Sequence, residues 1–228
     1  MGLPTSMRAT TPATLLGGLA TLVVTVSAAV VLLAQRGEPA RVATADPQPT
    51  WQVLRSSYAE VRVPPASQGW SVPDPDGMLF YADPEGEPVV GVRGPAVLDD
   101  GYCPSGTAAP SNRAFVGLTR PVPGLDPGVV DRRLQAAWTA GIAGTTGEPL
   151  ATRRTTVRLA DGAPAAASRT TIRLHDRDPC TPQRVELHLV SSRARDGVVS
   201  AVLVRDLGPR SATEETVRRI LRSLRARR

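Results

Sequence analysis

The sequence contains no lysine, so all 27 of its basic side chains are arginines. Without lysine the chain can form neither a phosphate-binding loop ending in Gly-Lys nor a Schiff base with a carbonyl substrate. It also lacks a Ser-x-x-Lys motif and the Gly-x-Ser-x-Gly turn that carries the nucleophile of many hydrolases. These absences exclude several of the most common classes of enzyme.

Cysteine and histidine are scarce, with two residues of each. Two cysteines are too few for a four-cysteine zinc module. Possible metal ligands cluster once, at His175-Asp176-Arg177-Asp178, with His188 on a later segment. Because Arg177 would repel a cation and aspartates favour turns, we interpret this cluster as a connection between strands. We therefore predict no catalytic residue, no bound metal and no cofactor.

One long segment has no charge at all. Residues 13–34 read ATLLGGLATLVVTVSAAVVLLA and lie between Arg8 and Arg36. A helix of this length crosses the hydrocarbon core of a bilayer, which is about 30 Å thick. The alternative is a cleaved secretory signal, whose apolar region normally spans about 7–15 residues. We expect an uncleaved transmembrane helix, which makes the lipid bilayer the first partner of the protein.

The segments around this run suggest an orientation. Residues 1–12 contain no acidic side chain, which favours a cytoplasmic leader. Residues 35–50 are rich in proline and small side chains, as flexible linkers are. Residues 51–228 have the size of one ordinary domain, which we expect outside the cytoplasm, attached to the cell membrane. The cysteines agree with this placement because disulfides form in oxidising compartments.

The first half of this domain is divided into short apolar runs by proline- and glycine-rich turns. Strands are predicted at residues 51–54, 60–63, 70–72, 78–81, 89–92 and 114–118. A helix should then begin at Asp126-Pro127, because Asp is a good N-cap and Pro suits the first turn. Its expected apolar face comprises Val130, Leu134, Ala137 and Trp138.

The second half alternates apolar and polar side chains more regularly. Strands are predicted at residues 155–159, 168–174, 185–189 and 198–204, with hairpin turns at Asp161-Gly162 and Asp196-Gly197. The run 198–204 is apolar on both faces, as in a central strand. A last helix is expected from the capping box that starts at Ser211 and ends at Glu214. This order predicts an α+β fold, with a mainly antiparallel sheet flanked by helices.

Cys103 and Cys180 both lie beside proline in loop-like surroundings. We predict that they form a disulfide with each other. Closing so long a loop stabilises a fold by about 4 kcal/mol in the chain-entropy model. A redox-active pair is the alternative, but the Cys-x-x-Cys spacing typical of such pairs is absent.

The layout of residues 51–228 resembles a family of uncharacterised, membrane-anchored extracytoplasmic proteins of high-GC Gram-positive bacteria. The resemblance rests on Trp51-Gln-Val, Val63-Pro-Pro to Gly69-Trp70, Cys103 before Ala114-Phe-Val-Gly, Ala136-Ala-Trp138, Cys180 and Ile220-Leu-Arg-Ser-Leu. It implies a domain similar to the PsbP-type α/β/α sandwich, in which an antiparallel sheet lies between helices. The resemblance implies no activity and supplies no catalytic residue.

The formal net charge of +6 is concentrated at the end of the sequence. Six arginines follow Val217 with no acidic residue among them, and they equal the whole excess: Arg218, Arg219, Arg222, Arg225, Arg227 and Arg228. We expect these residues on the last helix, where cations near a helix C-terminus are stabilising. Arg225, Arg227 and Arg228 are candidates for contact with anionic lipid or an anionic envelope polymer. Nucleic acid is not an expected partner outside the cell.

Three functional hypotheses follow. The first is a non-enzymatic binding module that recognises a membrane or envelope protein, or an envelope polymer. The second is a cell-envelope hydrolase of unfamiliar type that uses His175 or His188 with an aspartate. The third is a structural subunit of a membrane complex.

Overall fold

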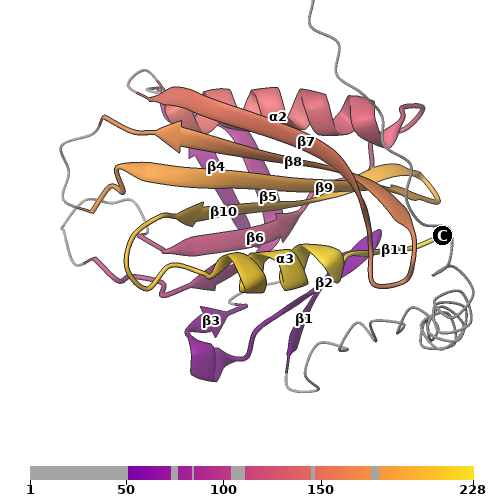
Figure 1. Ribbon diagram of the computed structural model, residues 1–228, viewed down its shortest axis with the longest axis horizontal. Helices are drawn as coiled ribbons and strands as arrows, with labels where there is room; N and C mark the ends of the chain where they lie inside the picture. The colour runs from indigo at the N-terminus through magenta and orange to yellow at the C-terminus, as the bar shows by residue number, and fades with distance from the viewer. Residues whose placement is uncertain (1–50, 73–76, 84, 104–110, 145–146, 176–179) are drawn as a thin grey trace, which may run out of the picture. The chain divides into compact units, whose positions relative to one another are not determined.

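Antiparallel sheets dominate the computed structural model of the chain, which describes residues 51–72, 77–83, 85–103, 111–144, 147–175 and 180–228. Within these residues the chain forms an eight-stranded sheet, a second sheet of three strands and two α-helices (Figure 1). The predicted α+β class with a mainly antiparallel sheet is confirmed.

The main sheet contains most of the long strands. Its order is β3 (Trp70–Ser71), β5 (Pro88–Leu98), β6 (Ala114–Leu118), β10 (Gly197–Asp206), β9 (Arg184–Ala194), β8 (Pro164–Arg173) and β7 (Glu148–Arg158). The remaining strand, β4 (Met78–Ala82), pairs with the first half of β5. The side chains of β9 and β10 are buried on both faces, so the run predicted as a central strand has that position.

Two hydrophobic clusters cover the two faces of this sheet. Because successive side chains of a strand point to opposite faces, Val202 and Val204 belong to one cluster, whereas Ala201 and Leu203 belong to the other. Helix α2 (Pro127–Ala143) covers the Val202 face. Helix α3 (Glu214–Arg222) covers the Leu203 face together with the small sheet β1 (Gln52–Arg55), β2 (Ala59–Val63) and β11 (Arg225–Ala226). A short 3₁₀ turn, η1 (Ala66–Gln68), connects β2 to β3.

Helix α2 begins where the sequence predicts it to begin. The carboxylate of Asp126 accepts a hydrogen bond from the backbone N–H of Gly128, and Pro127 occupies the first turn. On the sheet side, the Trp138 ring packs edge-on against Tyr81, with 6.1 Å between the ring centroids. This aromatic contact anchors the middle of α2 to the sheet.

Helix α3 differs from its prediction at both ends. Its N-cap is Thr213, whose hydroxyl accepts from the N–H of Thr216, whereas the Ser211 hydroxyl donates to the carbonyl of Asp206. The predicted capping box is therefore wrong. The helix ends at Arg222, because the chain then turns to pair β11 with β2. Arg225, Arg227 and Arg228 consequently lie beyond the helix, not on it.

Two long hairpins diverge at one end of the main sheet. Both turn at the predicted positions, with Gly162 and Gly197 at positive φ. The ladder between β8 and β9 ends at the pair Ala166 and Ser191, whereas β9 continues beside β10 as far as Ala194. From that point the β7–β8 hairpin bends toward α3 and the C-terminus (Figure 1). The backbone N–H of Ala160 at its tip donates to the carbonyl of Arg222.

The predicted leader, transmembrane helix and linker, residues 1–50, lie outside the described residues. In the ranges that are described, neither α2 nor α3 has the length and apolar character that a membrane crossing requires.

Candidate functional site

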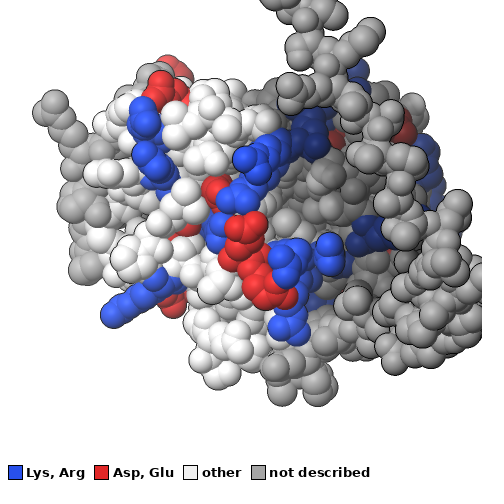
Figure 2. Space-filling model, in the orientation of Figure 1, with Lys and Arg blue, Asp and Glu red and all other residues white. Residues whose placement is uncertain are grey.

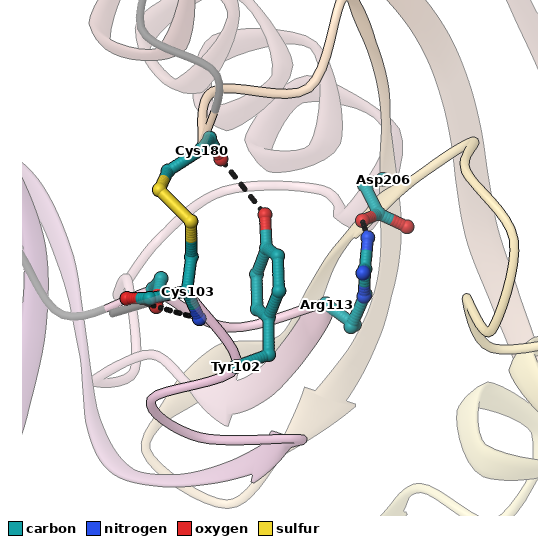
Figure 3. Close-up of a disulfide and its surroundings, with 6 residues drawn as sticks. Tyr102, Cys103, Arg113, Cys180 and Asp206 are labelled. Atoms are coloured by element: carbon teal, nitrogen blue, oxygen red, sulfur yellow. Dashed lines mark hydrogen bonds and ion pairs between the residues drawn. A yellow bond between two sulfur atoms is a disulfide. The ribbon is translucent and has the colours of Figure 1, made fainter. Parts of the chain in front are cut away.

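The disulfide connects the loop after β5 to the connection between β8 and β9 (Figure 3). Cys103 and Cys180 are 77 residues apart in the sequence, and their Cα atoms are 5.7 Å apart. The predicted bond is thus confirmed. It ties together two long connections at the end of the sheet opposite the diverging hairpins.

Polar contacts surround this disulfide. The Tyr102 hydroxyl donates to the carbonyl of Cys180 at 2.8 Å, and the guanidinium of Arg113 lies 3.8 Å from the centre of the Tyr102 ring. Arg113 also binds the buried carboxylate of Asp206 at 2.9 Å. Figure 3 shows the aromatic ring between the disulfide and this ion pair. These contacts link the loop after β5 to the β8–β9 connection and to the end of β10.

A second group of charges is buried under the first turn of α3. Glu186 accepts from Arg205 Nε at 2.9 Å and from Arg205 Nη2 at 2.6 Å, and its other oxygen accepts from Arg169. His188 donates from Nε2 to Glu186 at 3.2 Å. Arg169 reaches further to Glu214 of α3 at 3.2 Å. The network therefore connects three strands of the main sheet to the start of the helix.

Its electrostatics follow from these contacts. Burial alone would raise the pKa of Glu186, but hydrogen bonds from His188, Arg169 and Arg205 outweigh burial and lower the pKa to about 2. Burial lowers the pKa of His188, and the nearby carboxylate of Glu186 only partly opposes this. Both Glu186 oxygens are occupied by donors, so this carboxylate is suited to holding α3 rather than to accepting a proton.

The structure does not bring the two histidines together. His188 pairs with Arg169 inside the sheet, whereas His175 lies beyond the end of β8, six residues further on, on the order of 20 Å away. His175 is exposed and lies 3.7 Å from Glu148. Within the described residues, no hydroxyl or thiol forms a hydrogen bond with His188. The other members of the predicted cluster, Asp176, Arg177 and Asp178, lie outside the described residues.

A third polar group lies under α2. Asp131 is 2% exposed, and neither its Oδ1 atom nor the nearby Ser168 hydroxyl has a hydrogen-bond partner among the described residues. Burial raises the pKa of Asp131 to about 6, and the positive charges of Arg154 and Arg132 oppose the rise only in part. One turn along the helix, Gln135 accepts from Arg154 at 2.6 Å and donates to Thr139. The helix thus buries several polar side chains beside Trp138.

The diverging hairpins leave an open cleft of about 690 Å³, which we call the hairpin cleft. Its volume lies in the range of ligand pockets. It is lined by Asp126, Pro127, Gly128, Thr156, Pro164, Ala165, Ala166, Ser192, Arg193, Ala194, Arg195 and Arg228. The start of α2 therefore forms one wall, the two hairpins form two more, and the C-terminus completes the lining. A second, smaller hollow of about 250 Å³ lies at the other end of the sheet, beside His175.

The charge of the hairpin cleft is mainly positive. Three of the lining residues are arginines, and Asp126 is the one acidic residue among them. The carboxylate of Asp126 is already bound to the backbone N–H of Gly128 at the start of α2. The cleft can therefore receive negatively charged groups without displacing a buried ion pair.

The three arginines expected to contact anions differ in position. Arg225 lies in β11, 4.0 Å from Glu60, and Arg227 uses its main chain to bond Tyr58 and Arg195. Arg228 lines the hairpin cleft. Figure 2 shows basic side chains gathered on the face that carries α3, with a short band of acidic side chains between them. Their contact with an anionic surface stays a prediction.

Sequence reasoning missed the hairpin cleft and both buried polar groups. Glu186 and His188 alternate with leucines and so resemble the solvated face of a strand, whereas α3 covers that face. For Asp131, Gln135 and Thr139 a signal was present, because their four-residue spacing places them on one side of the helix. The cleft had no local signal, because it depends on where two strands separate.

The comparisons with known proteins identify a family and no activity. No curated protein matches the chain. The profile of a family described as a domain of unknown function (DUF8017) matches residues 43–228. The chain therefore belongs to the DUF8017 family.

Proposed function

We propose that this chain is a single-pass, membrane-anchored extracytoplasmic module that binds a ligand of the cell envelope in its hairpin cleft. The observation that carries the proposal is the cleft itself, an open volume of about 690 Å³ lined by side chains from β7, β8, β9 and the start of α2. Rigid strands and a helix form most of its walls, which suits a preformed binding site.

Two further features support the placement outside the cytoplasm. The uncharged run 13–34 is long enough to anchor the chain, and the disulfide between Cys103 and Cys180 is of a kind that persists in oxidising compartments. A resident of the cell surface meets peptides, lipids and envelope polymers. A domain that follows such an anchor closely in the sequence would meet them near the membrane.

The orientation can be tested by labelling single cysteines in intact cells. Glu85, an exposed residue between β4 and β5, is replaced by cysteine in one variant, and Thr5 in the leader is replaced in a second. A membrane-impermeant maleimide should label E85C in intact cells and T5C only after the membrane is opened. The reverse pattern would contradict the proposed placement.

The binding site can be tested by filling the cleft. Ala166 lines the cleft and is half-buried, so A166W should occupy its volume, whereas A151W places the same ring on the exposed strand β7. Envelope fractions added to the full chain in a non-ionic detergent should raise the unfolding temperature of the wild type and of A151W by several degrees. A166W should show no such response. An equal response from A166W, or none from the wild type, would overturn the proposal.

A further inference from the structure

Each arginine that lines the hairpin cleft lacks a tight ion pair. The guanidinium group of Arg193 forms no hydrogen bond or ion pair with any described residue. Arg195 approaches the carboxylate of Asp196 only to 4.0 Å, and Arg228 approaches that of Asp161 only to 3.9 Å. Some other arginines are paired more closely, as Arg113 with Asp206 at 2.9 Å shows. The cleft therefore holds positive charge that the described part of the chain does not neutralise at close range.

The start of α2 contributes little direct bonding to a ligand. The N–H of Gly128 is bound by Asp126, those of Val129 and Val130 are bound by the Asp126 carbonyl, and Pro127 has none. The charged donors available to an anion in the cleft are therefore the guanidinium groups, beside the hydroxyls of Thr156 and Ser192. Each guanidinium can donate two parallel hydrogen bonds to a phosphate or a carboxylate.

The rest of the lining limits the chemical classes of ligand that the cleft can recognise. Prolines and alanines form the apolar part of the walls, and no aromatic side chain is among the described residues that line them. A nucleotide base or the face of a neutral sugar would therefore find no ring on which to stack. The recognised feature must be the charge of the ligand.

The arginines also approach from two sides of the sheet. Arg193 and Ala194 are neighbours in β9, so their side chains point to opposite faces of the sheet. Ala194 packs in the cluster under α3, and Arg193 therefore points to the α2 face. Arg228 follows β11, which pairs with β2 on the α3 face. The positive groups are thus spread along the cleft, and an ion with a single centre cannot meet all of them equally.

We infer that the ligand of the hairpin cleft is a chain of linked phosphate groups, held by Arg193, Arg195 and Arg228. This inference rests on the proposed function and specifies its ligand. Successive phosphates carry negative charge at regular intervals, so one chain can satisfy several arginines on different elements. Each phosphate also presents the paired oxygens that a guanidinium binds in bidentate fashion.

The test uses the full chain in a non-ionic detergent, with inorganic tripolyphosphate as the probe in titration calorimetry. Tripolyphosphate should bind at least tenfold more tightly than orthophosphate, and binding should weaken as salt is added. R193Q, R195Q and R228Q should each weaken binding about threefold to tenfold. The matched control is R184Q, the same change at the opposite end of β9, which should bind like the wild type.

Competition identifies the source of the phosphate. Displacement of tripolyphosphate by a glycerol phosphate trimer supports a polymer of linked phosphates. Equal displacement by soluble short-chain phosphatidylglycerol, which carries a single phosphate, would overturn the choice of linked phosphates. Equal binding by a short polyglutamate would overturn the choice of phosphate. Wild-type affinity in both R193Q and R195Q would overturn the inference. If envelope fractions still stabilise the wild type but not A166W while tripolyphosphate fails to bind, the proposed function stands and the inference alone is wrong.

Discussion

Glu186 and Arg205 form a buried ion pair in which two guanidinium nitrogens bind a single carboxylate oxygen, at 2.9 Å and 2.6 Å. The two residues are opposite each other on β9 and β10, and Arg205 also donates to the carbonyl of Ala212 at 2.6 Å. The pair therefore joins the centre of the sheet to the segment that leads into α3. Several properties of the fold depend on it.

Replacing Glu186 by glutamine should destabilise the protein strongly. The amide keeps the shape but leaves Arg205 buried without a counter-charge, which typically costs about 3 kcal/mol or more. Chemical denaturation should show this loss. The matched change E214Q affects an exposed carboxylate of the same network, so it should alter the free energy of unfolding by less than about 1 kcal/mol. Equal effects from the two variants would contradict the role assigned to Glu186.

Acid should weaken the fold through the same carboxylate. The pKa of Glu186 is about 2 in the folded protein, below the ordinary value of 4.5, so its contribution is complete above about pH 4.5 and is lost as the pH falls toward 2. The shift corresponds to about 3 kcal/mol. Denaturation of the wild type and E186Q from pH 6 to pH 2 should show their stabilities converging. If the stabilities of the wild type and E186Q fell in parallel with pH, Glu186 would not be the cause of the acid sensitivity.

Asp131 should have the opposite pH dependence. Its pKa is raised from 3.8 to about 6, so the folded state favours the neutral acid, and stability is lost as the pH rises through 6. D131N removes the charge and should therefore raise the free energy of unfolding near pH 8 by about 3 kcal/mol, with little change near pH 4. The control D126N alters an exposed acid at the start of the same helix. A destabilised D131N at pH 8 would contradict this account.

Loss of the disulfide should lower the unfolding temperature markedly. Because 77 residues separate the two cysteines, the double variant C103S/C180S should lose about 4 kcal/mol, or roughly 10 °C. Scanning calorimetry with and without a reductant provides the measurement. Reductant should shift the wild type to the temperature of the variant and leave the variant unchanged. An unchanged unfolding temperature of the wild type after full reduction would show that the disulfide contributes little to stability.

Local chemistry allowed much of the fold to be predicted. Asp126-Pro127 marked the start of α2, and residues 114–118 matched β6 because apolar residues there are bounded by polar ones. The two Asp-Gly turns marked both hairpins. These features depend on a few neighbouring residues, so a single sequence contains enough information to locate them.

Other elements depend on partners that are distant in the sequence. β5 continues past Gly94-Pro95 because a register shift against β6 absorbs the interruption. β7 starts at Glu148, well before its first predicted residue, because pairing with β8 supports a segment exposed on both faces. The hairpin cleft has the same origin, since it lies where β8 and β9 separate beyond the pair of Ala166 and Ser191. A pattern within one strand does not encode such a separation.

The pairing of β11 with β2 has a consequence for the order of folding. Arg225 pairs with Glu60 and Ala226 pairs with Ala59, so the small sheet joins the first part of the domain to its last. During synthesis β2 can pair with β11 only after almost the whole domain has been made. Contacts of such long range slow folding, so the nascent domain stays open for longer.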